Sequence, residues 1–275
     1  MEKEMKITVL IDNIARAGLI CEWGLSFFIE FENHCYLLDM GTTGDFAANA
    51  ADLGIDLNRV DFSILSHAHY DHSDGMGVFF EKNDHTKLYI REGAGENCYG
   101  MNDEGETYYI GIKEGSLEKY KDRIVYAGGD YRICENVYLI PHKTPGLDAI
   151  GRKVGMKIRT GDGWKTDDFS HEQSLVFRTD KGLVIFNSCS HGAPQNIMKE
   201  VCASFPGEKV HAYLGGLHQY RSTPEEVRSL AQLLKDMNVD HIYTGHCTGD
   251  AAYAILKEEL GEKIDQFCSG YQIDM

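Results

Sequence analysis

The chain has 275 residues, of which 43% are hydrophobic and 25% charged, a balance that suits a globular protein with a sizeable core. Its 43 acidic residues outnumber 27 basic ones, for a formal net charge of −16. This charge repels nucleic-acid phosphates and anionic lipids at long range, so we expect no nucleic-acid partner and no membrane partner.

Other sequence-wide features concern location and domain organisation. The first twelve residues lack the apolar run and cleavage site of a signal peptide, so we predict a cytoplasmic protein. The eight cysteines are scattered without a CxxC pair, which indicates reduced thiols. Cys189 and Cys247 adjoin candidate ligands, but we expect Cys247 to be a packed thiol. No linker-like stretch interrupts the chain, so we predict one domain over residues 1–275.

The first predicted elements are strands followed by a helix. Apolar runs bounded by charged or turn residues predict the strands at residues 7–10, 25–30 and 34–38. An alanine-rich segment predicts a helix from Asp45 to Leu53, which Gly54 ends.

A short buried strand is predicted at residues 60–65, and the sequence SHAHYDHSDG (residues 66–75) follows it in a loop. This loop contains His67, His69, Asp71 and His72. In an extended stretch, side chains two positions apart project to the same side, so the first two histidines can bind one ion. The other two follow once the backbone turns. Two pairs of ligands predict one or two divalent metal ions, with zinc favoured and iron or manganese also compatible.

After a strand at residues 87–90, residues 91–168 are rich in glycine, tyrosine and charge and show weak periodicity. We expect loops and short strands that extend over the site and select the substrate. Basic residues in this region are candidates for binding an anionic substrate. For any single one of them, the simpler explanation is that it belongs to a solvated charged surface. These basic residues are Arg91, Lys143, Arg152, Lys153, Lys157 and Arg159.

The C-terminal part alternates strands and helices. Strands at residues 174–178 and 183–187 are expected to form a hairpin. A helix begins after Thr223 as N-cap, with proline and acids in its first turn, and runs to about Met237. A strand at residues 241–244 follows.

Further candidate ligands follow predicted strands. His191 lies in SCSHG and His246 in TGHCTG, and we predict both as metal ligands. His218 ends GGLH, where paired glycines allow close backbone approach. It could be a ligand, a proton carrier or a substrate contact, and we favour the last two over an ordinary exposed histidine. Asp39 also ends a strand, so either it orients a metal-binding histidine or it is a simple turn residue.

The HAHYDH run is similar to the HxHxDH signature of the metallo-β-lactamase superfamily. Other segments resemble the subfamily named 7,8-dihydropterin-6-methyl-4-(β-D-ribofuranosyl)aminobenzene-5′-phosphate synthase-like. They are ITVLIDN (7–13), EWGLSFFIE (22–30), LLDMG (37–41), SCSHG (188–192), GGLH (215–218) and TGHCTG (244–249). The resemblance implies an α/β fold, the αββα sandwich of two mixed β-sheets flanked by helices, with a one- or two-metal site at the sheet edges.

The resemblance also implies roles for single residues. His171 is spaced like the superfamily's third metal-binding histidine, but the subfamily often carries an acid there, so ligand and bystander both remain open. His142 is one position out of register with another such pattern, in which Lys143 takes the histidine position, so we predict a surface-turn histidine. The aspartate that bridges two metals in many hydrolytic members has no counterpart, so either Cys189 or His191 substitutes for it or one metal site is weakened.

These residues predict a metal-dependent hydrolase that acts on a small, anionic ester, lactone or phosphoester. Asp71 would hold the nucleophilic water or serve as base, and His218 would protonate the leaving group. The resemblance implies an alternative, a synthase that joins a dihydropterin diphosphate to the amine of an aminobenzene ribosyl phosphate. A non-catalytic metal or redox binding protein is a further alternative.

Overall fold

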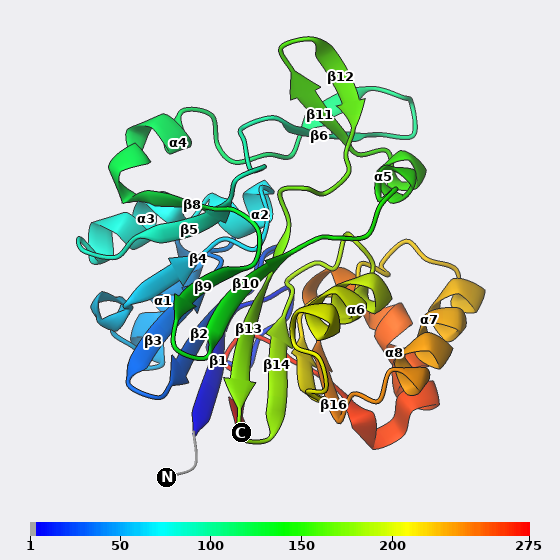
Figure 1. Ribbon diagram of the computed structural model, residues 1–275. Helices are drawn as coiled ribbons and strands as arrows, with labels where there is room; N and C mark the ends of the chain where they lie inside the picture. Colours follow the sequence, from blue (N-terminus) through cyan, green and yellow to red (C-terminus); the bar gives the residue numbers. More distant parts are fainter. Residues whose placement is uncertain (1–3) are drawn as a thin grey trace.

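Two large β-sheets pack face to face in the computed structural model, which describes residues 4–275 (Figure 1). Residues 1–3 lie outside the described residues, and with them the start of the N-terminal segment in which the sequence shows no signal-peptide features. The first sheet has the strand order β18-β1-β2-β3-β4-β5-β8. Its strands are β1 (Met5–Ile11), β2 (Ser26–Phe31), β3 (His34–Leu38), β4 (Phe62–Ile64), β5 (Leu88–Arg91), β8 (Ile124–Ala127) and β18 (Gln272–Asp274).

The second sheet has the strand order β17-β16-β15-β14-β13-β10-β9. Its strands are β9 (Tyr131–Cys134), β10 (Val137–Pro141), β13 (Gln173–Thr179), β14 (Gly182–Phe186), β15 (Val210–Leu214), β16 (His241–Thr244) and β17 (Ile264–Gln266). The predicted hairpin is β13–β14, whose antiparallel register pairs Thr179 with Gly182. The predicted strand before the C-terminal TGHCTG motif is β16.

Aromatic side chains fill the space between the two sheets. Phe27 of β2 packs against Phe186 of β14 with ring centroids 5.5 Å apart, and Phe31 packs against Phe177 of β13 at 5.2 Å. All four rings are buried, and burial of such a side chain contributes about 1.5–3 kcal/mol. This core fixes the two sheets relative to each other, and with them the strand ends that carry the candidate ligands.

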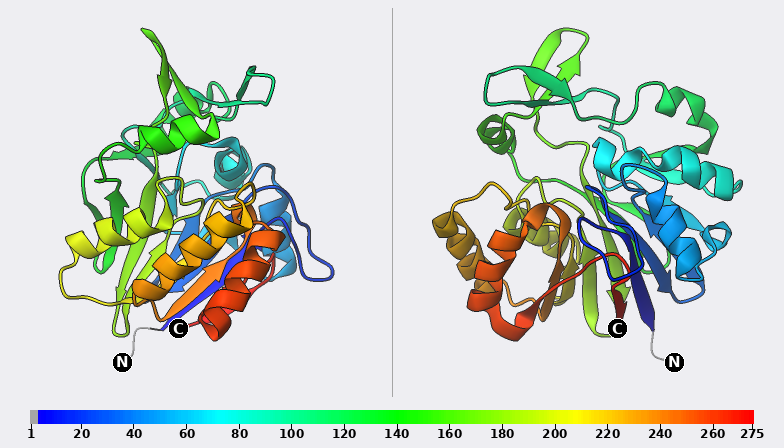
Figure 2. Two further views of the ribbon diagram at one scale, coloured as in Figure 1. Left: turned by 90° about the vertical axis from the view of Figure 1, so that its right-hand side faces the viewer. Right: turned by 180° about the vertical axis from the view of Figure 1, so that it is seen from behind.

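Helices cover the outer face of each sheet, which completes an αββα sandwich (Figure 2). The first sheet is covered by α1 (Asp45–Asp52), α2 (Tyr70–Ser73) and α3 (Met76–Lys82), and the second by α6 (Pro194–Ser204), α7 (Pro224–Asp236) and α8 (Asp250–Leu260). The predicted start of α7 is confirmed, because Thr223 and Glu226 form a capping box. Within residues 4–275, no helix combines the length and apolar character needed to cross a membrane.

The region of residues 91–168 is more ordered than the sequence indicated. A small third sheet of β6 (Cys98–Met101), β7 (Thr107–Tyr109), β11 (Lys157–Thr160) and β12 (Gly163–Thr166) lies above the sandwich in Figure 1, near α5 (Asp148–Val154). The helix α4 (Ser116–Lys119) also belongs to this region. Short strands were expected in this region, but β8, β9 and β10 join the two large sheets and are part of the sandwich itself.

The strands that precede candidate ligands end on the same side of the sandwich. Strands β3 and β4 are parallel neighbours in the first sheet, as are β14, β15 and β16 in the second. Parallel neighbours present their carboxyl ends at one edge, which is where open α/β sheets bind ligands. The fold therefore brings together loops that lie far apart in the sequence.

Candidate metal centre

Three buried imidazole rings form a triangle at the carboxyl ends of β4 and β14. His67 and His69 come from the loop after β4, and His191 from the loop after β14. Their ring centroids lie 4.6 Å (67–69), 4.8 Å (67–191) and 4.7 Å (69–191) apart. We call these three residues the imidazole cluster. The structure thus brings together two histidines of the first motif and a histidine more than a hundred positions away, and all three are candidate ligands predicted from the sequence.

The spacing within the imidazole cluster fits a shared cation. The Nε2 atoms of His67 and His191 lie 3.3 Å apart. Two imidazole nitrogens bound to one tetrahedral ion at about 2.0–2.1 Å lie about 3.3 Å from each other. Burial and the neighbouring imidazoles lower the pKa of both histidines well below the usual range, and burial lowers the pKa of His69 to about 3. All three rings are therefore neutral at physiological pH, the form that binds metals.

Asp71, His72 and His246 form a second group, which we call the carboxylate cluster. The Oδ2 atom of Asp71 lies 3.8 Å from Nε2 of His72 and 3.5 Å from Nε2 of His246. Burial alone would raise the pKa of Asp71, but the two histidines outweigh burial and hold it below the usual range. Burial lowers the pKa of His246, but the contact with Asp71 raises it to about 9. Protonated His246 thus balances the charge of the Asp71 carboxylate, which a bound cation would otherwise neutralise.

Hydrogen bonds to the outer ring nitrogens fix the direction of two candidate ligands, His67 and His72. The Nδ1 atom of His72 lies 2.8 Å from Oδ2 of Asp39, and that of His67 lies 2.8 Å from the Ser66 hydroxyl. The same hydroxyl donates to Asp39 Oδ2 at 2.7 Å. A proton on Nδ1 leaves the Nε2 lone pair directed inward, as in metal sites whose histidines pair with carboxylates. Asp39 therefore orients a candidate ligand, one of the two roles that the sequence left open.

Unpartnered buried atoms also indicate that a cation belongs here. The His69 Nε2 and His246 Nε2 atoms are buried and have no hydrogen-bond partner within residues 4–275. Buried polar atoms without partners are costly and uncommon, and a metal ion explains such a concentration. The donor set of imidazoles with one carboxylate suits zinc, iron or manganese. The residues present thus fit a divalent metal.

Cys189 takes the position between the two clusters. Its sulfur lies 3.2 Å from Nε2 of His72. The same sulfur lies close enough to share an ion with His67 and His191 on one side, or with His72 and His246 on the other. The side chain is 2% exposed. The sequence left open whether Cys189 or His191 replaces the absent bridging aspartate, and the geometry favours Cys189.

His171 lies beside the imidazole cluster, with both ring nitrogens already engaged. Its Nδ1 atom accepts a hydrogen bond from the Ala68 amide at 3.2 Å, and its Nε2 atom lies 3.1 Å from Oδ2 of Asp167. These contacts hold the backbone between His67 and His69. Of the two roles that the sequence left open, this geometry favours that of bystander.

Replacing His171 with asparagine is therefore expected to leave the number of bound metal ions unchanged. The free energy of unfolding should fall by about 1–3 kcal/mol, because Asp167 loses its buried partner. Metal analysis after dialysis and denaturant unfolding measure these two effects. Loss of a full metal equivalent would instead identify His171 as a ligand; His191→Ala, which removes a ligand, is the comparison.

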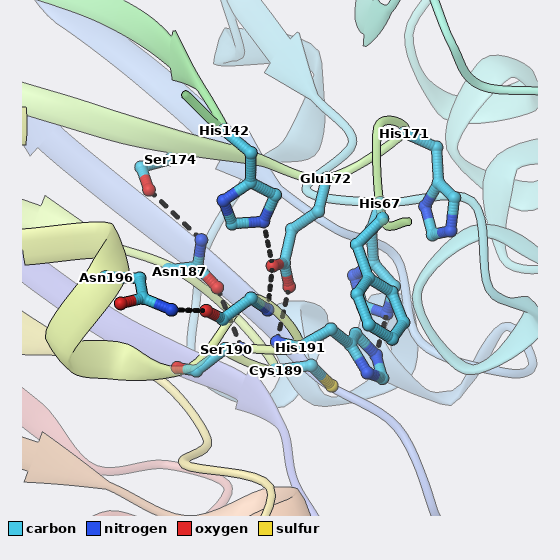
Figure 3. A network of polar contacts seen from close by, with 12 residues as sticks. His67, His142, His171, Glu172, Ser174, Asn187, Cys189, Ser190, His191 and Asn196 are labelled. Atoms are coloured by element: carbon cyan, nitrogen blue, oxygen red, sulfur yellow. Dashed lines mark hydrogen bonds and ion pairs between the residues drawn. The ribbon is translucent and has the colours of Figure 1, made fainter. Parts of the chain in front are cut away.

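A buried ion-pair network holds the loop that carries His191 (Figure 3). Glu172 accepts hydrogen bonds from the amides of His191 and Gly192, each at 3.0 Å, and its Oε2 lies 2.6 Å from Nε2 of His142. The other nitrogen of His142 lies 2.9 Å from Oε2 of Glu200, on α6. The expectation of a surface-turn histidine was wrong, because two carboxylates draw His142 inside, where its side chain is 7% exposed.

Stability should depend on pH through His142. Burial opposes its protonation, but Glu172 and Glu200 raise the pKa of His142 to about 9 from 6.5. The folded protein then binds the proton more tightly than the unfolded chain, so this stabilisation is complete below about pH 6.5 and is lost as the pH rises through about 9. The shift corresponds to a contribution on the order of 3 kcal/mol.

Denaturant unfolding of chelator-treated protein between pH 6 and 10 measures this contribution. The expected result is a decline in wild-type stability across this range that is smaller by on the order of 3 kcal/mol in His142→Gln, where position 142 cannot titrate. The raised pKa of His246 leaves a further decline that both proteins share. Parallel pH curves for the two proteins would contradict the role of His142.

A cavity of about 830 Å³ opens over both clusters. His69, Asp71 and His191 contribute to its wall, together with aromatic, basic and thiol side chains. These include Trp23, Tyr70, Tyr108, Lys153, Cys189, His218, Tyr220, Arg221 and Cys247. Of the six basic residues proposed from the sequence, Lys153 lines this cavity; Arg91 instead donates to the Gly129 carbonyl, and Lys143 pairs with Asp130. Arg221 was missed because it lies outside the middle region.

An αββα sandwich with a histidine-rich centre at its strand ends defines a class of metal-binding proteins. The model of the metallo-beta-lactamase superfamily matches residues 24–186, and the chain belongs to this superfamily. The fold class predicted from the sequence is therefore confirmed, and membership of this superfamily implies divalent metal binding.

Two curated relatives come from Methanocaldococcus jannaschii. A 7,8-dihydropterin-6-methyl-4-(beta-D-ribofuranosyl)-aminobenzene-5'-phosphate synthase is 28% identical over 267 residues, covering 90% of this chain and 88% of the relative. An uncharacterised protein is 26% identical, covering 92% and 94%. Among solved structures, a metal-dependent hydrolase of the beta-lactamase superfamily is similar with a TM-score of 0.81 and 25% identity, covering 98% of each chain.

Proposed function

We propose that the chain is a metal-dependent hydrolase of a small anionic ester, lactone or phosphoester. Its imidazole and carboxylate clusters would hold one or two divalent ions, with zinc favoured by the nitrogen-rich donor set. One observation carries the proposal: three neutral imidazoles and an ionised carboxylate converge beneath a cavity of about 830 Å³, large enough for a small molecule.

The residues divide the chemistry between them. A bound divalent ion supplies Lewis acidity and brings the pKa of water toward neutrality. Asp71, ionised and 7% exposed, accepts a hydrogen bond from the attacking water and so orients it. Its low pKa makes it a poor proton acceptor at neutral pH, so we assign it orientation in preference to general base catalysis.

The cavity wall supports an anionic substrate. Arg221, whose guanidinium lies over the Tyr220 ring, gives the wall a positive charge on a chain whose net charge is −16, whereas Lys153 is paired with Glu226 at 2.6 Å. Arg221 therefore provides local attraction for a small anion. Trp23 and Tyr220, whose rings pack 5.5 Å apart, cover the side of the carboxylate cluster next to His246. Such a covered site excludes bulk water and strengthens the electrostatic interactions within it.

A pterin-transferring synthase is the second candidate, because the relative of that name aligns with 90% of this chain. The same centre would bind a leaving diphosphate through its metal and basic side chains. We place the hydrolase first because the solved structure with a TM-score of 0.81 is described as a metal-dependent hydrolase and is similar over nearly the whole chain.

Activity screening distinguishes the candidates. Metal-loaded protein is incubated with phosphomonoesters, phosphodiesters, lactones and thioesters, with and without a chelator. The proposal predicts chelator-sensitive hydrolysis of one class, and its loss in Asp71→Asn, which keeps the shape but not the charge. Diphosphate release that requires an arylamine acceptor would identify the synthase, and absence of both activities in metal-loaded protein would contradict an enzymatic role.

A further inference from the structure

Two cysteines and a histidine meet beside the carboxylate cluster. Cys189, His218 and Cys247 come from the loops after β14, β15 and β16, and their ligand atoms all lie within 4.8 Å of one another. The two cysteines are 2% and 1% exposed. The sequence indicated a packed thiol at position 247, but a packed thiol does not require a second thiol and an imidazole at this distance.

The backbone is shaped around the Cys247 sulfur. A Cβ atom on Gly216 would lie 2.4 Å from this sulfur and 2.9 Å from the Ser188 carbonyl oxygen, so any side chain there would displace it. His218 adopts the left-handed conformation, with φ of 51°, which is uncommon for a residue other than glycine. Its buried Nδ1 atom has no hydrogen-bond partner within residues 4–275. Strain and an unpartnered nitrogen in one place are features of functional sites.

We propose that Cys189, His218 and Cys247 form a sulfur-rich metal site next to the histidine-rich clusters. Zinc binds thiolate sulfur at about 2.3 Å and imidazole nitrogen at about 2.0 Å, so the tetrahedral ligands of one ion lie about 3.5–3.8 Å from each other. The three ligand atoms lie within 4.8 Å of one another, so side-chain movements of about 1 Å bring them to this spacing. Two thiolates select soft or borderline ions such as zinc over magnesium or manganese. On binding, both S–H protons pass to water.

This assignment deepens the proposed function, on which it rests in part, because Cys189 also lies against His72 of the carboxylate cluster. It gives the chain a sulfur-rich substitute for the absent bridging carboxylate. It also assigns His218 as a ligand, one of the roles that the sequence left open. A second group of potential ligands lies nearby and consists of His69, Cys98, Asp167 and His171. It is less suitable for a metal ion because both nitrogens of His171 are already hydrogen-bonded.

Cobalt titration of reduced, metal-free protein tests the proposal. Cobalt(II) bound to thiolates absorbs in the near ultraviolet through sulfur-to-metal charge transfer, so this band reports metal–sulfur bonds independently of activity. In Cys247→Ser the band should fall by about half, because one of two sulfur ligands is lost. His218→Ala should retain the band but bind cobalt at least about 10-fold more weakly. Cys202→Ser, a half-buried cysteine on α6, is the control and should match the wild type.

X-ray absorption of the zinc-loaded wild type provides a second measurement that needs no variant. Two sulfur ligands per chain support the proposal, whereas one or none overturns it. An unchanged cobalt band in Cys247→Ser also overturns it, as does titration of fewer than eight thiols in the unfolded, unreduced protein, which would indicate a disulfide. If sulfur ligation fails while His67 and His69 still hold an ion, the proposed function stands and this inference alone is wrong.

Discussion

Alanine at both His67 and His69 is expected to remove the metal ion from the imidazole cluster and abolish activity. The two rings supply two of three converging imidazoles, and His67 Nε2 lies 3.3 Å from its counterpart in His191. Loss of a residue that merely supports a ligand weakens metal affinity 10- to 100-fold, so loss of two ligands should exceed about 100-fold. Competition with a chromophoric chelator measures this affinity.

The double variant should still fold. Without metal, the imidazoles of this cluster lie buried with unpartnered nitrogens, so their removal relieves part of that cost even as it opens a cavity. Circular dichroism and denaturant unfolding of metal-free protein check this point. His241→Ala, in a partly exposed pair with Asp265, is the control and should retain full metal content. Wild-type affinity in the double variant would refute the assignment of the imidazole cluster.

Replacing Glu172 with alanine is expected to cause the largest loss of stability, about 3–5 kcal/mol, because it breaks a fully buried ion pair. Its carboxylate accepts hydrogen bonds from the amides of His191 and Gly192 and pairs with His142 at 2.6 Å. Alanine leaves those amides without an acceptor. Because the amides fix the loop of His191, metal affinity should also fall by about 10- to 100-fold.

Two substitutions separate this role from a general effect of losing a glutamate. Glu172→Gln keeps the shape and one acceptor oxygen, so it should lose less stability than alanine. Glu208→Ala removes a carboxylate from a partly exposed pair with Arg178, where about 0–1 kcal/mol is expected. Unfolding in the presence of a chelator and metal titration measure both properties. Equal effects of alanine at positions 172 and 208 would show that the buried network does not support the loop.

Local sequence patterns predicted the parts of the site whose chemistry is contained in one segment. The four ligand-type residues of HAHYDH follow β4 directly, and both SCSHG and TGHCTG follow strands. A strand followed by a ligand-rich loop is visible without knowing any long-range contact. The same holds for α7, whose N-cap, proline and acids are adjacent in sequence.

Long-range pairing set the features that local patterns did not predict. The partners of His142 lie 30 and 58 positions away, and nothing near it in the sequence shows that two buried acids surround it. Likewise, three short strands become part of the large sheets only by long-range or neighbouring pairing: β8 pairs with β5, β10 with β13, and β9 with β10. Cys247 resembles an ordinary packed thiol until the fold places it beside Cys189 and His218.

Elemental analysis of the untreated wild-type protein, expressed as metal per chain, tests the central claim most directly. The clusters described above predict two or more equivalents of a transition metal, chiefly zinc, that survive dialysis without chelator and are removed by chelation. Fewer than two would show that replacement of the bridging aspartate by Cys189 has cost a site. No transition metal, in a protein that also fails to take up added zinc or cobalt, would contradict the assignment of a metal centre.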